Sequence, residues 1–298
     1  MSSATSIKEK LKNNAKKEHS SVQNEFILYG LERTIYRISI SRYADRFILK
    51  GGIFLYAVFE RDFARATQDI DILAWRINNE ADNIERIFKE IFSIECDDAL
   101  CFDLSSIKVK NITEFKEYHG VNISVTATLD KTRIPVSIDI GFGDVIYPER
   151  IKMDFPTILD MEVPVVYAYS IYSVISEKFE AIVSLGLVNS RLKDFYDIYF
   201  IGKSKCFCGR KLQNAIIETF NHRNTGFDDI VAFTDEYIND KNNQSRWNHF
   251  VNKRNVTDKV DFPEAIEFCK AFLLPVVESI VHRSSFEKNW DPVLERWM

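Results

Sequence analysis

Two aspartates separated by one residue, Asp69 and Asp71, are the side chains in this sequence best suited to chemistry. They lie in segment 67–72, where polar and apolar residues alternate as in a half-buried strand. Residues two apart on a strand project from the same face, so the two carboxylates should lie side by side and repel each other. Mg²⁺ would neutralise them, since it commonly binds one or two carboxylates and completes its shell with water and phosphate oxygens. The alternative is a pair of solvated carboxylates at a strand end.

A third aspartate, Asp139, has the same setting, because it lies between two isoleucines in a second strand-like segment. If that strand lies beside the first, Asp139 completes a cluster of three carboxylates. Two metal ions about 3.5–4 Å apart in such a cluster can activate an attacking hydroxyl and stabilise a leaving phosphate oxygen. The pattern therefore indicates metal-assisted chemistry on a phosphate.

A pair of glycines, Gly51 and Gly52, follows the apolar run 47–49 and precedes a predicted helix. Backbone N–H groups at such a turn can approach a phosphate closely, and the N-terminus of a helix favours anions. The backbone of this turn could therefore approach a phosphate group.

The elements that must position these residues form two halves. In the first half, helical spacing of apolar residues and strand-like alternation predict several helices against a mixed sheet. In the second half, the pattern predicts helices. We predict helices over 22–46, 53–59 and 79–92 and strands over 47–49, 69–73, 101–110, 121–129 and 133–141. After Pro164 we predict helices over 170–185, 190–201, 210–221 and 263–282.

The expected fold class is thus α+β, with a mixed-sheet domain at residues 1–165 and a helical domain at 166–298. Ser170 is the expected N-cap of the first helix in the second domain. We expect the polar residues 1–20 to fray, and 222–262 is a polar stretch whose weak pattern predicts no element.

Composition and charge restrict the partners, the compartment and the metal sites that we expect. The chain has 298 residues and a formal charge of −5, so any surface that binds nucleic acid must be a local basic patch. Its five cysteines are odd in number and scattered, which favours reduced thiols in a cytoplasm. No apolar run follows the first lysines, and none approaches the ~20 residues that span a bilayer, so we expect neither a signal peptide nor a membrane segment. The histidines and cysteines lack the spacing of a zinc site.

Four segments together resemble the AbiEii-type nucleotidyltransferase toxins, which belong to the DNA polymerase β-like nucleotidyltransferase superfamily. Residues 49–52 and 65–72 look like the opening motif of that family. Ser176-Glu177-Lys178 is similar to its lysine motif, and residues 191–198 are similar to its R-x-K-D-x-x-D motif. The resemblance covers about residues 26–203, and the C-terminal third carries no matching motif.

The resemblance implies a role for each matching residue. One departure is Gly52, because many members of the superfamily have serine there; the backbone donors remain, but one hydroxyl contact to phosphate is lost. The implied roles are phosphate cradling by Gly51 and Gly52, metal binding by Asp69, Asp71 and Asp139, contact with the triphosphate by Lys178, a place beside the active site for Asp194, and contact with phosphates of nucleotide or acceptor by Arg191 and Lys193.

Several assignments stay open at this point. Arg65 is either a phosphate ligand or a partner that steadies the Asp69 and Asp71 carboxylates, and Thr67 is a candidate nucleotide-binding residue if it shares their strand face. The alternative for the charged residues of the 191–197 helix, which their spacing favours less, is a surface ion-pair network. In that network Asp197 would pair with Lys193 at i, i+4 spacing and be structural.

The reaction implied by the resemblance is Mg²⁺-dependent transfer of a nucleoside monophosphate from an NTP to an acceptor hydroxyl. The implied acceptor is RNA, at the 3′ end of tRNA, and the implied role is that of a toxin in a toxin–antitoxin or phage-defence pair with a cognate antitoxin. Two alternatives stay open, namely modification of a small molecule or protein, and an inactive nucleotide-binding module. The basic residues between 203 and 211 could contact RNA phosphates, although a solvated loop between helices is the commoner explanation for such a stretch.

Overall fold

The computed structural model describes residues 3–61, 67–113, 119–188, 191–227, 230–253 and 259–298, and it divides into two compact units. The first unit comprises residues 1–144 and 150–169, and the second comprises 145–149 and 170–298. The chain therefore passes from the first unit to the second for the last time between Tyr169 and Ser170. The division into domains at 1–165 and 166–298 stays a prediction.

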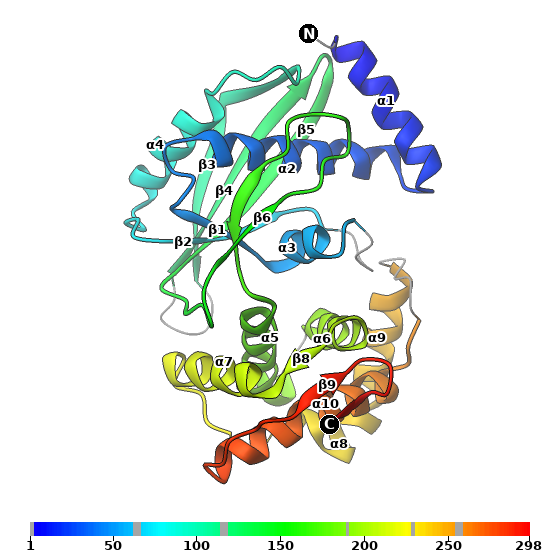
Figure 1. Ribbon diagram of the computed structural model, residues 1–298. Coiled ribbons are helices and arrows are strands. Elements are labelled where there is room, and N and C mark those ends of the chain that lie inside the picture. Colours follow the sequence, from blue (N-terminus) through cyan, green and yellow to red (C-terminus); the bar gives the residue numbers. More distant parts are fainter. Residues whose placement is uncertain (1–2, 62–66, 114–118, 189–190, 228–229, 254–258) are drawn as a thin grey trace. The chain divides into compact units, whose positions relative to one another are not determined.

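The first unit contains a seven-stranded mixed sheet in the order β3-β4-β5-β2-β1-β7-β6 (Figure 1). Adjacent strands are antiparallel except for the β5–β2 and β1–β7 pairs, which are parallel. The strands are β1 (Phe47–Lys50), β2 (Ile70–Ala74), β3 (Leu100–Thr113), β4 (His119–Leu129), β5 (Thr132–Phe142), β6 (Ile151–Asp154) and β7 (Val165–Ala168). The helices of this unit are α1 (Ala4–Lys17), α2 (Val22–Ile40), α3 (Gly51–Val58) and α4 (Ala81–Phe92).

One face of the sheet is apolar and is covered by helices. Along β5, Ile134 and Val136 are buried, and they pack against α2 where Gly30 lies. A Cβ on Gly30 would lie 2.7 Å from Cγ2 of Ile134, so the helix can approach the strand this closely only because that residue has no side chain. On β3, Phe102 stacks on Phe92 of α4 with ring centroids 4.7 Å apart.

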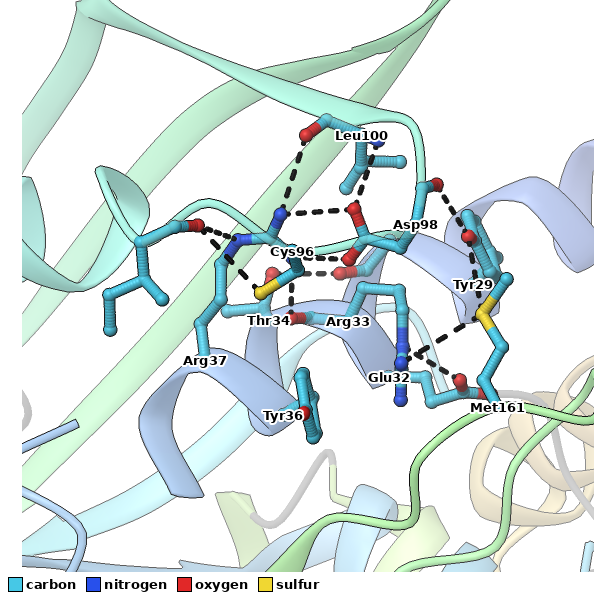
Figure 2. Close-up of polar contacts among 12 residues, drawn as sticks. Tyr29, Glu32, Arg33, Thr34, Tyr36, Arg37, Cys96, Asp98, Leu100 and Met161 are labelled. Carbon is cyan, nitrogen blue, oxygen red and sulfur yellow. Dashed lines mark hydrogen bonds and ion pairs between the residues drawn. The ribbon is translucent and has the colours of Figure 1, made fainter. Parts of the chain in front are cut away.

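Helix α2 also carries buried ionic groups that hold two connecting segments (Figure 2). Arg37 donates to both carboxylate oxygens of Asp98, at 2.6 and 3.0 Å. Glu32 accepts a hydrogen bond from the backbone N–H of Ile158 and lies 3.0 Å from Nε of Arg33. Burial raises the pKa of Glu32 to about 7, although Arg33 and the Ile158 N–H act in the opposite direction. Both connections are thus fixed to α2 by charged groups.

The second unit is mainly helical, as expected, with a small three-stranded sheet in the order β10-β9-β8. Its helices are α5 (Ile171–Leu185), α6 (Leu192–Ser204), α7 (Gly209–His222), α8 (Asp235–Asn239), α9 (Lys241–Lys253) and α10 (Phe262–Val281), with 3₁₀ turns at Gly186–Val188 and Val231–Phe233. Its strands are β8 (Phe207–Cys208), β9 (Asn289–Asp291) and β10 (Arg296–Trp297).

Segment 145–149 belongs to the second unit because it is bonded to the start of α5. The predicted N-cap is confirmed: Ser170 Oγ accepts from the backbone N–H of Ser173 at 3.1 Å. Both serine hydroxyls donate to the carbonyl oxygen of Tyr147, and the Tyr147 N–H donates to Ser173 Oγ at 2.9 Å. The Tyr147 hydroxyl accepts from Asn214 of α7 at 2.8 Å.

The mixed sheet and the main helices confirm the predicted α+β fold, and the structure differs from the sequence-based expectations in local detail. Residues 4–17 form α1 because Ile7, Leu11 and Ala15 recur at helical spacing and are buried. Segment 222–262 contains α9, which buries Trp247. The helix expected to reach residue 46 ends at Ile40. Within the described residues, no helix combines the length and apolar character needed to cross a membrane.

Candidate active site

Asp71 and Asp139 lie side by side on adjacent strands. Strands β2 and β5 are parallel, and the two aspartates are direct partners in their register. Neighbouring strands are about 4.8 Å apart, and partners in register project from the same face. Both residues are half-buried, whereas the isoleucines that flank them are almost fully buried on the opposite face. The apolar flanks therefore fix the strands, and the two carboxylates share one polar face.

Asn122 on β4 completes this row, and the sequence analysis missed it. It is the register partner of Asp139, and its Nδ2 donates to Asp139 Oδ1 at 2.6 Å and to Ser137 Oγ at 2.9 Å. An amide donor this close fixes the direction of the carboxylate. The register of β4 on β5 reveals the contact.

The glycine pair lies against Asp71. The backbone N–H of Gly52 donates to Asp71 Oδ2 at 3.3 Å. Gly51 has φ +63°, and a Cβ built on it would lie 1.9 Å from that same oxygen. Glycine is therefore required at position 51 both by the backbone conformation and by the carboxylate. Both glycines belong to the first turn of α3, which begins at Gly51 and not, as expected, at residue 53.

Asp69 lies just outside the strand. Strand β2 begins at Ile70, so strand alternation does not by itself place Asp69 beside Asp71. The hydroxyl of Thr67, a buried residue, lies 3.3 Å from the Asp69 carbonyl oxygen and 3.4 Å from its Oδ1. Arg65 lies outside the described residues.

These residues suit a divalent cation with few protein ligands. The described part of the chain contains no group of three or more histidine, cysteine or acidic side chains arranged to hold a metal ion. Mg²⁺ usually takes only one or two carboxylates and fills the remaining positions with water and phosphate oxygens. The Asp71 and Asp139 pair fits that description, with one oxygen of each carboxylate oriented by an N–H donor.

A charged group from the opening motif, Lys50, lies next to this pair. Lys50, the register partner of Asp71, places its Nζ 2.7 Å from Oδ2 of Asp144 and 5.2 Å from the centre of the Tyr169 ring. Its side chain is 18% exposed. An ammonium group thus lies at the same end of β1 as the glycine turn, with Asp144 holding it in place.

The second unit holds the other predicted site residues. Lys178 of α5 places its Nζ 2.8 Å from Asp194 and 2.6 Å from Asp197, both on α6, and both aspartates are 0% exposed. Arg191 Nε lies 2.8 Å from the other oxygen of Asp194, and its side chain is 39% exposed. Burial would raise the pKa of Asp194, but Lys178 and Arg191 outweigh it and hold that pKa below its usual value.

This arrangement corrects one prediction. Asp197 was expected to pair with Lys193 on its own helix, but Lys193 is exposed and Asp197 is fully buried against Lys178. The network is therefore a buried link between two helices and not a surface feature. Among the basic residues of 203–211, Lys203 pairs with Glu295 and Arg210 with Glu287 at 3.0 Å.

Comparison with known families decides the assignment. The sequence model of the nucleotidyl transferase AbiEii toxin of type IV toxin–antitoxin systems matches residues 33–269. The chain belongs to the AbiEii family. It is therefore a nucleotidyltransferase and the toxin component of a type IV toxin–antitoxin system, as the sequence motifs predicted. The match contains every predicted site residue in both units and leaves α1 outside.

Two solved structures match the chain at low sequence identity. A protein described as a candidate nucleotidyltransferase from H. pylori is 12% identical, with a TM-score of 0.49, over 86% of this chain and 96% of that one. JHP933 from Helicobacter pylori is 12% identical, with a TM-score of 0.47, over 85% and 92%. No curated protein sequence matches the chain.

Proposed function

We propose that this AbiEii-family enzyme transfers a nucleoside monophosphate from an NTP to the 3′-terminal hydroxyl of tRNA in a Mg²⁺-dependent reaction. The observation that carries the proposal is the in-register pairing of Asp71 with Asp139, with the Gly51–Gly52 turn against Asp71. In this proposal Asp69, next to β2, is the third carboxylate of the site. The enzyme would act in the cytoplasm, as a toxin in phage defence.

In the proposed reaction the acceptor oxygen attacks the α-phosphorus of the NTP, the acceptor loses its proton, and the bond to pyrophosphate breaks. Mg²⁺, when bound, supplies charge neutralisation at the phosphate oxygens. The chain supplies position: Asn122 orients Asp139, and the missing side chain of Gly51 lets Asp71 approach the first turn of α3. Little other covalent work is needed, because alignment and charge account for most of the catalysis of phosphoryl transfer.

The remaining site residues have proposed roles in phosphate contact. These are Thr67 and Arg65 before β2, Lys178 on α5, and Arg191 and Lys193 at the start of α6. Lys178 is bonded to two buried carboxylates, so contact with the triphosphate requires it to share its ammonium group among three anions. Lys193 is exposed and would reach a phosphate without that cost, whereas Arg191 would share its guanidinium group between a phosphate and Asp194. Asp194 positions Lys178 and Arg191.

The test is transfer from each α-³²P-labelled NTP, with Mg²⁺, to intact tRNA, to 3′-trimmed tRNA and to an unrelated RNA of equal length. We expect label only on intact tRNA, and none after treatment with EDTA. Asp71→Asn and Asp139→Asn should abolish labelling, whereas Asp160→Asn, an exposed residue in the loop before β7, should not. Equal labelling of all three RNAs would refute the tRNA acceptor. Normal labelling by Asp71→Asn would refute the site.

A further inference from the structure

The face of β3, β4 and β5 that carries Asp139 is polar and exposed to solvent. Along β4, buried apolar residues alternate with half-buried Asn122, Ser124, Thr126 and Thr128. The register places these residues opposite the polar residues of β5, with Ser124 opposite Ser137 and Asn122 opposite Asp139. Helices α2 and α4 pack on the other face, as the contacts of Ile134 and Phe102 show. We call this surface the open face of the sheet.

Three basic residues lie on the open face. Lys108 and Lys110 on β3 are the register partners of Ser124 and Asn122, and Arg133 on β5 is the partner of Thr128. All three are exposed. Asp103 also lies on this face, where its carboxylate accepts hydrogen bonds from the hydroxyl and the backbone N–H of Ser105. Apart from Asp139, basic side chains therefore outnumber acidic ones among these residues, in a chain whose formal charge is −5.

A hollow of about 310 Å³ is lined by residues of β3, β4 and β5 together with Gln68 and Ile27 of α2. Its lining includes Ile27, Gln68, Ser106, Lys108, Ser124 and Ser137. Gln68 precedes Asp69 in the sequence, and Ser137 bonds to the same Asn122 that donates to Asp139. The hollow is therefore continuous with the site through one hydrogen-bonded row. Pockets of this size suit a small organic group, such as one nucleotide.

We propose that the open face binds the single-stranded 3′ end of the acceptor RNA, with the terminal nucleotide in the hollow beside Asp139. The inference rests on the proposed function, because it takes the acceptor to be RNA. Charge complementarity supports it: Lys108, Lys110 and Arg133 would meet the phosphates, while hydroxyl and amide groups bond to phosphate and sugar. From Asp139 to Arg133 the strand extends about 20 Å, which is room for several nucleotides.

The chemistry of the face also predicts how the RNA is read. Hydroxyl, amide and ammonium groups recognise the backbone and the ribose 2′-hydroxyl, whereas reading of bases needs stacking and edge contacts. We therefore expect binding that tolerates changes of base sequence and depends on salt. The basic stretch 203–211 is a weaker candidate for the same role, since Lys203 and Arg210 are paired with glutamates.

The test is fluorescence anisotropy with a 5′-labelled single-stranded RNA of about ten nucleotides, the full-length chain, and no NTP or Mg²⁺. The test variant is Lys108→Gln with Lys110→Gln. Its matched control is Lys10→Gln with Lys152→Gln, which removes the same charge from exposed positions on α1 and β6. Each lost phosphate contact should lower the slope of log K against log salt by about 0.7. We expect the test variant to lose about 1.4 in slope and to bind roughly tenfold or more weakly at 50 mM salt.

The outcomes separate the inference from the proposed function. Binding by the test variant that equals the control overturns the inference, even if tRNA labelling still requires Asp71. Absence of measurable RNA binding by the wild-type chain also overturns it. The inference is supported if the test variant binds RNA more weakly and the control variant does not. This holds even if Asp71→Asn retains transfer and the proposed catalytic site is therefore wrong. Ser124→Ala, which removes one hydroxyl from the hollow without changing charge, should weaken binding with an unchanged salt slope.

Discussion

Replacing Lys178 by methionine would remove the ammonium group that bonds to both Asp194 and Asp197. The two carboxylates are 0% exposed and lie 2.8 and 2.6 Å from Nζ. Arg191 would still contact Asp194, but its side chain is 39% exposed and it reaches one aspartate only. Removing one partner of a buried ion pair costs about 3–5 kcal/mol, because the remaining charge stays desolvated. We therefore expect the melting temperature of the second unit to fall by on the order of 10 °C at pH 7.

The size of this loss should depend on pH in a defined direction. In the wild-type protein the pKa of Asp194 is lowered, because Lys178 and Arg191 outweigh burial, so its stabilising contribution is present above about pH 4 and is lost as the pH falls through the lowered value. Without Lys178, burial should raise the pKa values of the two aspartates. As the pH decreases, protonation neutralises the buried carboxylates of the variant and reduces its loss of stability. The difference between variant and wild type should therefore shrink from pH 7 towards pH 4.

Calorimetry combined with the transfer assay separates a structural role of Lys178 from contact with phosphate. Adding Asp194→Asn and Asp197→Asn to Lys178→Met removes the buried charges and should restore most of the stability. If transfer activity stays low in that stable triple variant, Lys178 and Asp194 act at the nucleotide site and not only on stability. If transfer returns with stability, the role of Lys178 is structural. The control is Lys241→Met, an exposed lysine at the start of α9 with no proposed role in the site. A Lys178→Met protein that melts within 2 °C of wild type at pH 7 would refute the reasoning.

Two further predictions concern the first unit. Gly51→Ala should destabilise the fold by about 1–2 kcal/mol because its φ is +63°, and it should displace Asp71, so transfer should fall at least tenfold. The control is Gly186→Ala, at φ +50° with open space around it, which should show the loss of stability without the loss of transfer. Denaturation and transfer assays measure the two effects. Glu32, with its pKa raised to about 7, should lower the free energy of unfolding by about 3 kcal/mol as the pH rises from 4.5 to 7.5, and urea denaturation should show this slope flattened in Glu32→Gln.

The strands of the site were predictable because their pattern is local. Asp71 and Asp139 stand out among buried isoleucines, and alternation alone shows which face each occupies. The sequence could not show that the two aspartates lie side by side, because the order of strands in a sheet depends on pairing between distant segments. Asn122 was missed although the signal is local, because the turn at Asp130 and Lys131 joins β4 and β5 as a hairpin whose register places Asn122 opposite Asp139.

Charged residues on helices were harder to interpret from sequence. The i, i+4 rule suggested a pair between Lys193 and Asp197, but packing of α5 on α6 gives Asp197 a buried partner from another helix. Lys50 and Asp144 are similarly joined across distant parts of the chain. Helix α1 was missed because only three apolar residues mark its buried side in a largely polar run. Local rules identify elements well, whereas partners of charged groups depend on tertiary packing.

Segment 145–149 has a consequence for how this gene can be rearranged. The chain leaves the first unit after Asp144, contributes Tyr147 to the base of α5, returns at Arg150, and leaves again after Tyr169. A recombination point at 169/170 would therefore combine an α5 from one ancestor with a Tyr147 segment from another. Such chimaeras would keep both halves intact in sequence yet mismatch the bonds to Ser170, Ser173 and Asn214. We expect the two halves to be inherited together, and exchange between relatives to be confined to segments that lie wholly outside this interleaved stretch.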